Sequence, residues 1–120
     1  MNVEKLRDYC LSMPRATEDF PFDESVLAFR VFGKIFAMID LDDTKWFVTK
    51  CEPCYAEELR EKYAEIKPAF HMNKRYWNQL DLYGGLSDAM ICSLIRHSYS
   101  EVVKKLPRKI REEFPEIVLG

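Results

Sequence analysis

The first apolar positions of the chain repeat at intervals of three or four residues: Val3, Leu6, Cys10 and Met13. This spacing predicts an amphipathic helix, capped by Asn2 and ended by Pro14. Residues 12–24 contain two prolines and an acidic cluster, and we expect them to form an irregular connection. Its two phenylalanines, Phe20 and Phe22, are predicted to hold this connection against the core.

The pattern then changes from helical spacing to short apolar runs. Residues 26–32 and 35–41 are rich in β-branched and aromatic side chains. Two such runs separated by Gly33-Lys34 predict a β-hairpin. Residues 42–44 have the composition of a turn, and residues 45–50 are predicted to form a third strand.

A second helix and a second hairpin are predicted in the next part of the chain. Pro53 suits the first position of a helix, and apolar residues recur along one side of the segment that follows it. Residues 68–72 and 76–82 are expected to pair as strands. Residues 73–75 would then form the tip of this hairpin.

The longest helix is predicted between Ser87, a good N-cap residue, and Pro107, which ends it. Residues 108–114 are expected to form one more short helix. The order α-β-β-β-α-β-β-α predicts an α+β fold, in which N-terminal, middle and C-terminal helices pack on an antiparallel β-sheet. A length of 120 residues suits a single domain, residues 1–120.

Charge, hydropathy and cysteine usage exclude several classes of protein. The chain has 18 Lys and Arg against 20 Asp and Glu, so any basic surface has to be local. No apolar run reaches the roughly 20 residues that cross a bilayer, and the N-terminus lacks the order of a signal peptide. We therefore expect a cytoplasmic protein with no membrane partner, whose four cysteines are reduced thiols.

Several short segments resemble the motifs of one family and follow the same order: residues 14–22, 32–37, 50–53 and 71–77, and Ser98-Tyr99. Together they resemble the MmcQ/YjbR family, over about residues 1 to 106. The resemblance implies a CyaY/frataxin-like fold and DNA binding through two β-hairpins that act as wings. It brings no catalytic residues and no cofactor, so we expect a protein that is not an enzyme.

The predicted hairpin tips carry the basic residues that could contact DNA, Lys34 on the first tip and Lys74 with Arg75 on the second. Asn73 and Trp77 are expected to shape the second tip, and Trp77 could stack on an unpaired base. So few charges would bind DNA weakly and in a salt-sensitive way. The alternative is that the cations are solvated and Trp77 belongs to the core, which leaves a small adaptor or ligand-binding domain of unknown protein partners.

A second basic group lies at the end of the longest helix and beyond it: Arg96, Lys104, Lys105, Arg108, Lys109 and Arg111. Acidic residues are interleaved with this group, and Glu101 stands four positions before Lys105. Interleaved charges of opposite sign predict a solvated, ion-paired face. We therefore do not assign this group to the DNA site.

The sequence Cys51-Glu52-Pro53-Cys54 has the ingredients of a thiol redox site, since it follows a predicted strand and opens a helix. The helix dipole would lower the pKa of one thiol and make it a nucleophile. Against this hypothesis, thioredoxin-like sites belong to a βαβ unit, whereas the strands predicted here are antiparallel. Redox activity is therefore a third alternative.

Metal binding is not expected. Two acidic clusters, in residues 18–24 and 40–43, could bind a hard cation through oxygen. Neither has the spacing of a calcium loop, so solvated loops are expected instead. The cysteines and histidines outside residues 51–54 are too scattered in sequence to indicate a zinc site. His97 could pair with Glu101, four positions later.

Overall fold

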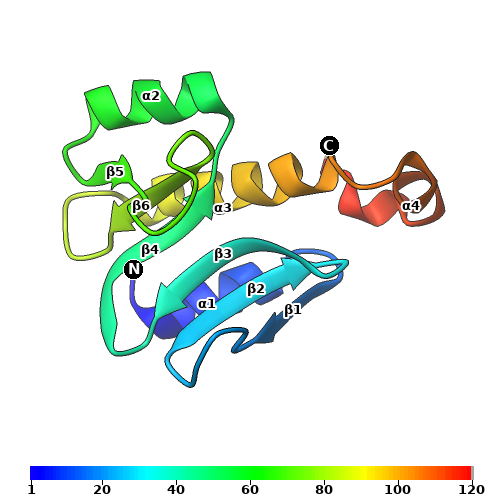
Figure 1. Cartoon of the computed structure of the whole chain (residues 1–120), viewed down its shortest axis with the longest axis horizontal. Helices are drawn as coiled ribbons and strands as arrows, with labels where there is room; N and C mark the ends of the chain where they lie inside the picture. Colours follow the sequence, from blue (N-terminus) through cyan, green and yellow to red (C-terminus); the bar gives the residue numbers. More distant parts are fainter. Residues whose placement is uncertain (120) are drawn as a thin grey trace.

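The protein is an antiparallel β-sheet with helices packed on it, which confirms the predicted α+β fold (Figure 1). The computed structural model describes residues 1–119. The strands are β1 (Ala16–Asp19), β2 (Val26–Val31), β3 (Lys34–Asp40), β4 (Asp43–Lys50), β5 (Ile66–Pro68) and β6 (Trp77–Asp81). Across the sheet they are ordered β1-β2-β3-β4-β6-β5. The helices are α1 (Val3–Leu11), α2 (Pro53–Lys62), α3 (Asp88–Val103), α4 (Arg108–Glu113) and the 3-10 helix η1 (Pro115–Ile117).

The three longest helices each begin after a residue whose side chain caps them. Asn2 and Ser87 each accept a hydrogen bond from the backbone N–H three residues later, at 2.8 and 3.1 Å. The Glu52 carboxylate accepts from the N–H groups two and three residues later, at 3.0 and 2.9 Å. These bonds satisfy N–H groups that have no partner inside the helix. The starts of these helices are therefore encoded locally.

The segment after α1 contains a strand, β1, where the sequence predicted an irregular connection. All four residues of β1 pair antiparallel with β2. Arg15, at φ 62°, turns the chain into the strand. A four-residue edge strand that is half exposed has no apolar run that would reveal it in the sequence. Phe20 and Phe22 are 48% and 68% exposed, so the prediction that they pack in the core is wrong.

The first hairpin turns one residue earlier than predicted. Phe32 and Gly33 have φ of 48° and 78°, as the two-residue type I′ turn of a hairpin requires. Lys34 is therefore the first residue of β3, opposite Val31, and does not belong to the turn.

The second hairpin has a longer connection than predicted. β5 pairs with β6 through Ile66, which is buried and lies opposite Leu80. Burial of Ile66 places the strand before residues 68–72, where it was expected. Residues 69–76 then form a loop, which we call the β5–β6 loop.

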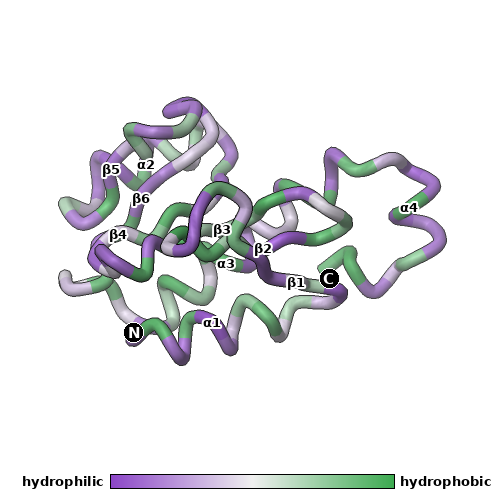
Figure 2. The backbone as a smooth tube through the Cα atoms, turned by 60° about the horizontal axis from the view of Figure 1, so that its bottom comes forward, coloured by the Kyte–Doolittle hydropathy of each residue, from purple (hydrophilic) through white to green (hydrophobic). Residues whose placement is uncertain are grey.

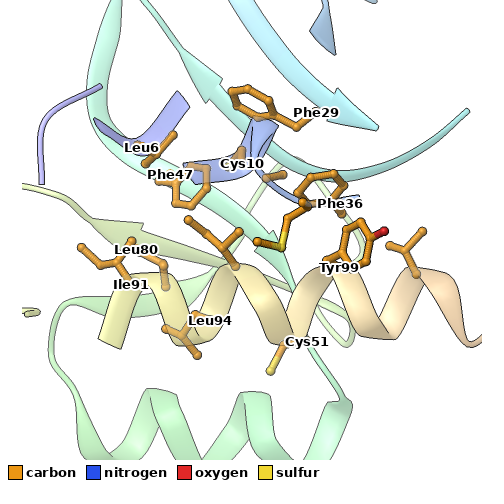
Figure 3. Close-up of a cluster of buried hydrophobic side chains, with 14 of the residues drawn as sticks. Leu6, Cys10, Phe29, Phe36, Phe47, Cys51, Leu80, Ile91, Leu94 and Tyr99 are labelled. Carbon is orange, nitrogen blue, oxygen red and sulfur yellow. The ribbon is translucent and has the colours of Figure 1, made fainter. Parts of the chain in front are cut away.

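One face of the sheet carries the hydrophobic core and is covered by α1 and α3 (Figures 1 and 3). Phe29, Phe36 and Phe47 are fully buried between the strands and these helices. Phe36 meets Tyr99 of α3 edge to face, with ring centres 5.4 Å apart. Burying a side chain of this size contributes about 1.5–3 kcal/mol, so this helix-covered face supplies most of the stability.

Two adjacent residues of α3 bond the helix to other elements. Ser98 Oγ donates to the Phe36 carbonyl and accepts from the Lys50 N–H at 2.8 Å. A register shift in the β2–β3 ladder lies beside Phe36, so its carbonyl needs a partner outside the ladder. Tyr99 donates to the Pro14 carbonyl at 2.6 Å. These bonds fix α3 to the sheet and to the end of α1.

Within residues 1–119, no helix packs across the opposite face of the sheet, and we call it the helix-free face. Because side chains alternate along a strand, Val48 and Lys50 of β4 share this face. Their ladder partners in β6 are Gln79 and Trp77. In the view of Figure 1, the strands lie in front of α1 and α3, so the helix-free face is turned toward the viewer.

The C-terminal elements lie at the end of the molecule away from α2 (Figures 1 and 2). Arg15 fixes them, because its guanidinium lies 4.5 Å from the centre of the Phe114 ring and its Nε bonds Glu116 at 3.1 Å. None of the helices that the structure describes is both long enough and apolar enough to span a membrane.

Candidate nucleic-acid interface

The β5–β6 loop contains the predicted basic tip. Asn73 is exposed and shapes a turn within it, since its Oδ1 accepts from the Arg75 N–H at 3.1 Å. The Asn73 carbonyl accepts from the N–H groups of Tyr76 and Trp77, both at 3.0 Å. The side chain and the carbonyl of Asn73 therefore together fix the conformation of this turn.

Arg60 of α2 tethers the β5–β6 loop. Its Nε donates to Asn78 Oδ1 at 2.6 Å, and its Nη2 donates to the Lys74 carbonyl. Hydrogen bonds from a charged donor are worth about 1.5–3 kcal/mol each. Arg60 therefore holds the β5–β6 loop against α2. The Lys74 ammonium lies 5.3 Å from the centre of the exposed Phe70 ring.

Lys34 and Trp77, which the sequence placed on different hairpins, line one groove of about 500 Å³. Arg30, Lys50 and Lys105 line it with them. Lys50 Nζ lies 5.8 Å from the centre of the Trp77 ring, within the range of a cation–π contact. We call this site, formed by these five residues at one end of the sheet, the basic groove.

The lysines of the basic groove are close enough to affect one another. Burial lowers the pKa of Lys50, and the charges of Lys105 and Lys34 lower it further, while Glu101 opposes them. Glu101 itself bonds Lys104 at 2.7 Å. Within residues 1–119, none of the three groove lysines forms an ion pair. Their positive charge is therefore available to a ligand.

Arg30 contributes less charge than the lysines. Its Nε bonds the Asp19 carboxylate at 2.8 Å, and its Nη1 donates to the Gly33 carbonyl at 2.8 Å. The ion pair offsets the guanidinium charge, and the bond to Gly33 holds the β2–β3 turn. Arg30 thus shapes the groove, whereas the lysines supply its positive charge.

Arg75 lies beside the groove without lining it. Its guanidinium carbon is 5.7 Å from the centre of the Tyr76 ring, and Lys105 Nζ is 4.8 Å from the same centre. Two cations therefore lie near the Tyr76 ring, Arg75 of the β5–β6 loop and Lys105 of the basic groove. Lys74 and Arg75 are exposed and could extend the basic groove along the loop.

The sequence did not identify Lys50 and Lys105 as members of this site. Lys105 stood within a charge-interleaved helix end, where ion pairs were expected. Lys50 stood at the end of a predicted strand. Only the register that places Lys50 opposite Trp77 could have indicated its position, and that register depends on how strands distant in sequence pair.

The thiols fit a redox site poorly. Cys51 is buried and Cys54 is exposed, and both are free. Burial raises the pKa of Cys51 to about 12, the opposite of the lowering that a nucleophile needs. The Glu52 carboxylate caps α2, so the positive end of the helix dipole already faces an anion. Figure 3 shows Cys51 beside α3 among apolar side chains, where it packs as a core residue.

Two members of the acidic cluster in residues 18–24 are occupied by structural bonds. Glu18 accepts from Arg7 Nε at 2.8 Å. Asp23 accepts from two backbone N–H groups and a serine hydroxyl, and these bonds lower its pKa. Across residues 1–119, no three His, Cys, Asp or Glu side chains lie close enough together to hold a metal ion.

His97 is a packed residue. Its Nε2 accepts from the Glu52 N–H at 3.1 Å, and its ring meets Tyr55 edge to face at 4.9 Å. Burial lowers the pKa of His97, so the neutral ring is the stable form. The predicted pair with Glu101 is not formed, because the Glu101 carboxylate bonds Lys104.

The fold and the basic groove define a small α+β domain, in which the described helices cover one face of the sheet and leave the other open. A family model, YjbR, matches residues 11–101. The chain belongs to the YjbR family, as its motifs predicted.

Relatives match along most of the chain. "Uncharacterized protein YjbR" of Escherichia coli K12 is 30% identical over 113 residues, 93% of this chain and 96% of that protein. "Uncharacterized protein YbdF" of E. coli O157:H7 is 29% identical over 109 residues, 88% of each chain. The crystal structure of Deinococcus radiodurans protein DR2400 is 32% identical, with a TM-score of 0.88 over 95% of this chain and 88% of that one. A crystal structure of a protein from Pseudomonas syringae is 29% identical, with a TM-score of 0.68 over 82% of this chain and 96% of that one.

Proposed function

We propose that this chain is a non-enzymatic, cytoplasmic domain that binds DNA through the basic groove and the β5–β6 loop. The observation that carries the proposal is the convergence of Lys34, Lys50 and Lys105 at Trp77. Ammonium groups without carboxylate partners can bind phosphates. The indole beside them offers an apolar surface to a sugar or an unpaired base.

The net charge of -2 sets the expected strength of this binding. Because the remaining surface is acidic on balance, the attraction comes from the groove alone. Three phosphate contacts give log K a slope of about −2.7 against log salt. The affinity for a duplex should therefore fall roughly 40-fold between about 50 and 200 mM salt.

Fluorescence anisotropy with a labelled duplex, measured over a range of salt concentrations, tests the groove. The double variant Lys50→Gln, Lys105→Gln removes two phosphate contacts, so the slope should become shallower by about 1.8. The matched control is Lys5→Gln, Lys109→Gln, which changes the net charge equally but on α1 and α4. If the groove variant and the control bind alike, the groove is not the site.

A second pair of variants tests the loop separately. Lys74→Gln, Arg75→Gln removes the exposed cations of the β5–β6 loop. We expect weaker binding than wild type, with a smaller change in slope than the groove variant causes, because these cations flank the groove. Unchanged binding would confine the interface to the groove. In a Trp46→Phe background, an unlabelled single strand titrated in parallel reports whether Trp77 fluorescence is quenched by base stacking.

A further inference from the structure

A second groove, of about 620 Å³, lies on the helix-free face. Its floor is apolar and comes from strands β2, β3 and β4, with Val26, Met38 and Val48 among its residues. Phe22 from the β1–β2 loop and Phe70 from the β5–β6 loop line it from the two sides of the sheet. We call this site the aromatic groove. Its volume lies within the roughly 300–1,000 Å³ of small-molecule pockets.

Phe22 and Phe70 are exposed although they line a groove. They are 68% and 57% exposed to solvent, and they stand on loops at opposite corners of the same face. Large apolar side chains gathered around a hollow indicate a binding surface, whereas scattered ones do not. Met72 lines both this groove and the basic groove, so the two sites adjoin.

Carboxylates give one end of the aromatic groove a negative charge. Asp40 and Asp43 line it directly, and Asp23, Glu24 and Asp42 line the neighbouring hollow. In the described part of the chain, neither Asp40 nor Asp43 has an ion-pair partner. Asp40 accepts only a backbone N–H, from Asp42 at 2.9 Å. A ligand that approaches this end therefore meets uncompensated negative charge.

Trp46, an aromatic wall of this groove, already has a cation of the chain beside its ring, Lys45, which does not line the groove itself. Lys45 Nζ lies 5.1 Å from the centre of the Trp46 ring, and 3.9 Å from Asp81. Trp46 is a lining residue, so a cation against this indole, with a carboxylate near it, is compatible with the local geometry. Lys67, on β5 opposite Gln79, lies toward the other edge of the face.

These observations narrow the class of ligand. A metal ion is disfavoured, because no three ligating side chains converge within residues 1–119. Phosphates are disfavoured by Asp40 and Asp43. We infer that the aromatic groove binds a small organic cation, with its ammonium group at Asp40 and Asp43 and its apolar body between Phe22, Trp46 and Phe70. Aromatic walls and carboxylates together are the chemistry that recognises such cations.

This inference does not rest on the proposed DNA binding, so its test uses other ligands. Three probes of similar size carry the charges +1, 0 and −1: naphthylethylamine, naphthylethanol and the carboxylate naphthaleneacetate. Titration of the ¹⁵N-labelled chain by NMR should show saturable shifts at Val48, Phe70 and their neighbours. The amine should bind roughly three- to tenfold more tightly than the alcohol, and the carboxylate should bind most weakly.

Two variants separate the charge from the apolar body. Asp40→Asn, Asp43→Asn keeps the turn-forming side-chain oxygens, and it should abolish the preference for the amine while leaving the alcohol bound. Phe70→Ser should weaken all three probes. Val118→Ser is the matched control, because Val118 is an exposed apolar residue that does not line this groove.

The inference is overturned if the three probes bind equally, if none gives saturable shifts, or if the shifts fall on the basic groove. It is also overturned if the double Asn variant keeps the preference for the amine. Far-UV circular dichroism of each variant confirms that the fold is intact before any titration is interpreted.

Discussion

The two faces of the sheet differ in how their side chains are bonded. On the helix-covered face, two polar side chains join separate elements: Ser98 bonds two strands, and Tyr99 bonds the chain after α1. On the helix-free face, the side chains of Lys50, Phe22 and Phe70 have no comparable role in holding elements together. The comparison indicates that one face stabilises the fold, and that the other is left with charge and aromatic surface for a ligand.

This difference changes how the family motifs are interpreted. Ser98, Tyr99 and Asn73 lie in segments that resemble the family, and each has a bond that fixes the backbone. Lys50 opens another such segment, where its N–H serves the fold and its side chain lines the basic groove. A shared motif is therefore no guide to function until backbone and side-chain roles are separated.

The largest effect should follow from Ser98→Ala. The substitution leaves the Phe36 carbonyl and the Lys50 N–H without their partner. Each unsatisfied buried group costs about 1–3 kcal/mol, so the free energy of unfolding should fall by about 2–4 kcal/mol in a urea titration. Ser93→Ala, at an exposed position of α3, is the matched control and should change it by less than about 0.5 kcal/mol.

If Ser98→Ala were neutral, the bonds of Ser98 would not stabilise the fold, and the contrast between the faces would weaken. DNA binding gives a second readout. The variant should keep the affinity of wild type wherever it remains folded, because Ser98 lines neither groove and its bond to Lys50 involves the backbone N–H alone.

Much of the fold could be predicted because its signals are local. A few residues of sequence are enough to recognise the caps at Asn2 and Ser87 and the apolar runs of β2 and β3. β1 could not be predicted, because its four residues form a strand only through the ladder with β2. Lys34 was assigned to a turn because Gly33 was taken as the first turn residue, whereas Phe32 adopts a positive φ.

The candidate sites were harder to predict than the fold. The basic groove combines residues of β2, β3, β4, β6 and the end of α3, which only tertiary packing brings together. The sequence indicated Lys34 and Trp77 but not Lys50 or Lys105. The aromatic groove gave no signal, because Phe22 and Phe70 resemble core residues in a sequence, and only the structure shows them exposed.

A smaller effect should follow from Arg60→Ala, which removes the tether of the β5–β6 loop. Loss of the part-buried charged bond to Asn78 should cost about 1.5–3 kcal/mol, and the exposed bond to the Lys74 carbonyl should add little. Because Met72 of this loop lines both grooves, ligand binding at both should weaken. Lys62→Ala, an exposed cation on the same helix, is the matched control. A variant that lost stability but kept both affinities would show that the loop is positioned without Arg60.

The free energy of unfolding should depend on pH through His97. Burial lowers the pKa of His97, so the folded state binds a proton less readily than the unfolded chain. Its contribution to stability is complete above pH 6.5, the ordinary histidine pKa, and is lost as the pH falls toward the lowered value. In urea titrations at a series of pH values, His97→Gln should flatten this decline. His71→Gln, at an exposed position of the β5–β6 loop, is the matched control for the substitution itself.

The smallest effect should come from the side chains that make the helix-free face distinctive. Phe22→Ser and Phe70→Ser each remove an aromatic ring that is more than half exposed, so each should change the free energy of unfolding by less than about 0.5 kcal/mol. Thermal and urea unfolding measure this change beside Ser98→Ala. A loss of more than about 1 kcal/mol would mean that these rings pack against the sheet. If both rings can be removed without cost, the fold does not need them, and their position around the aromatic groove requires a reason outside stability.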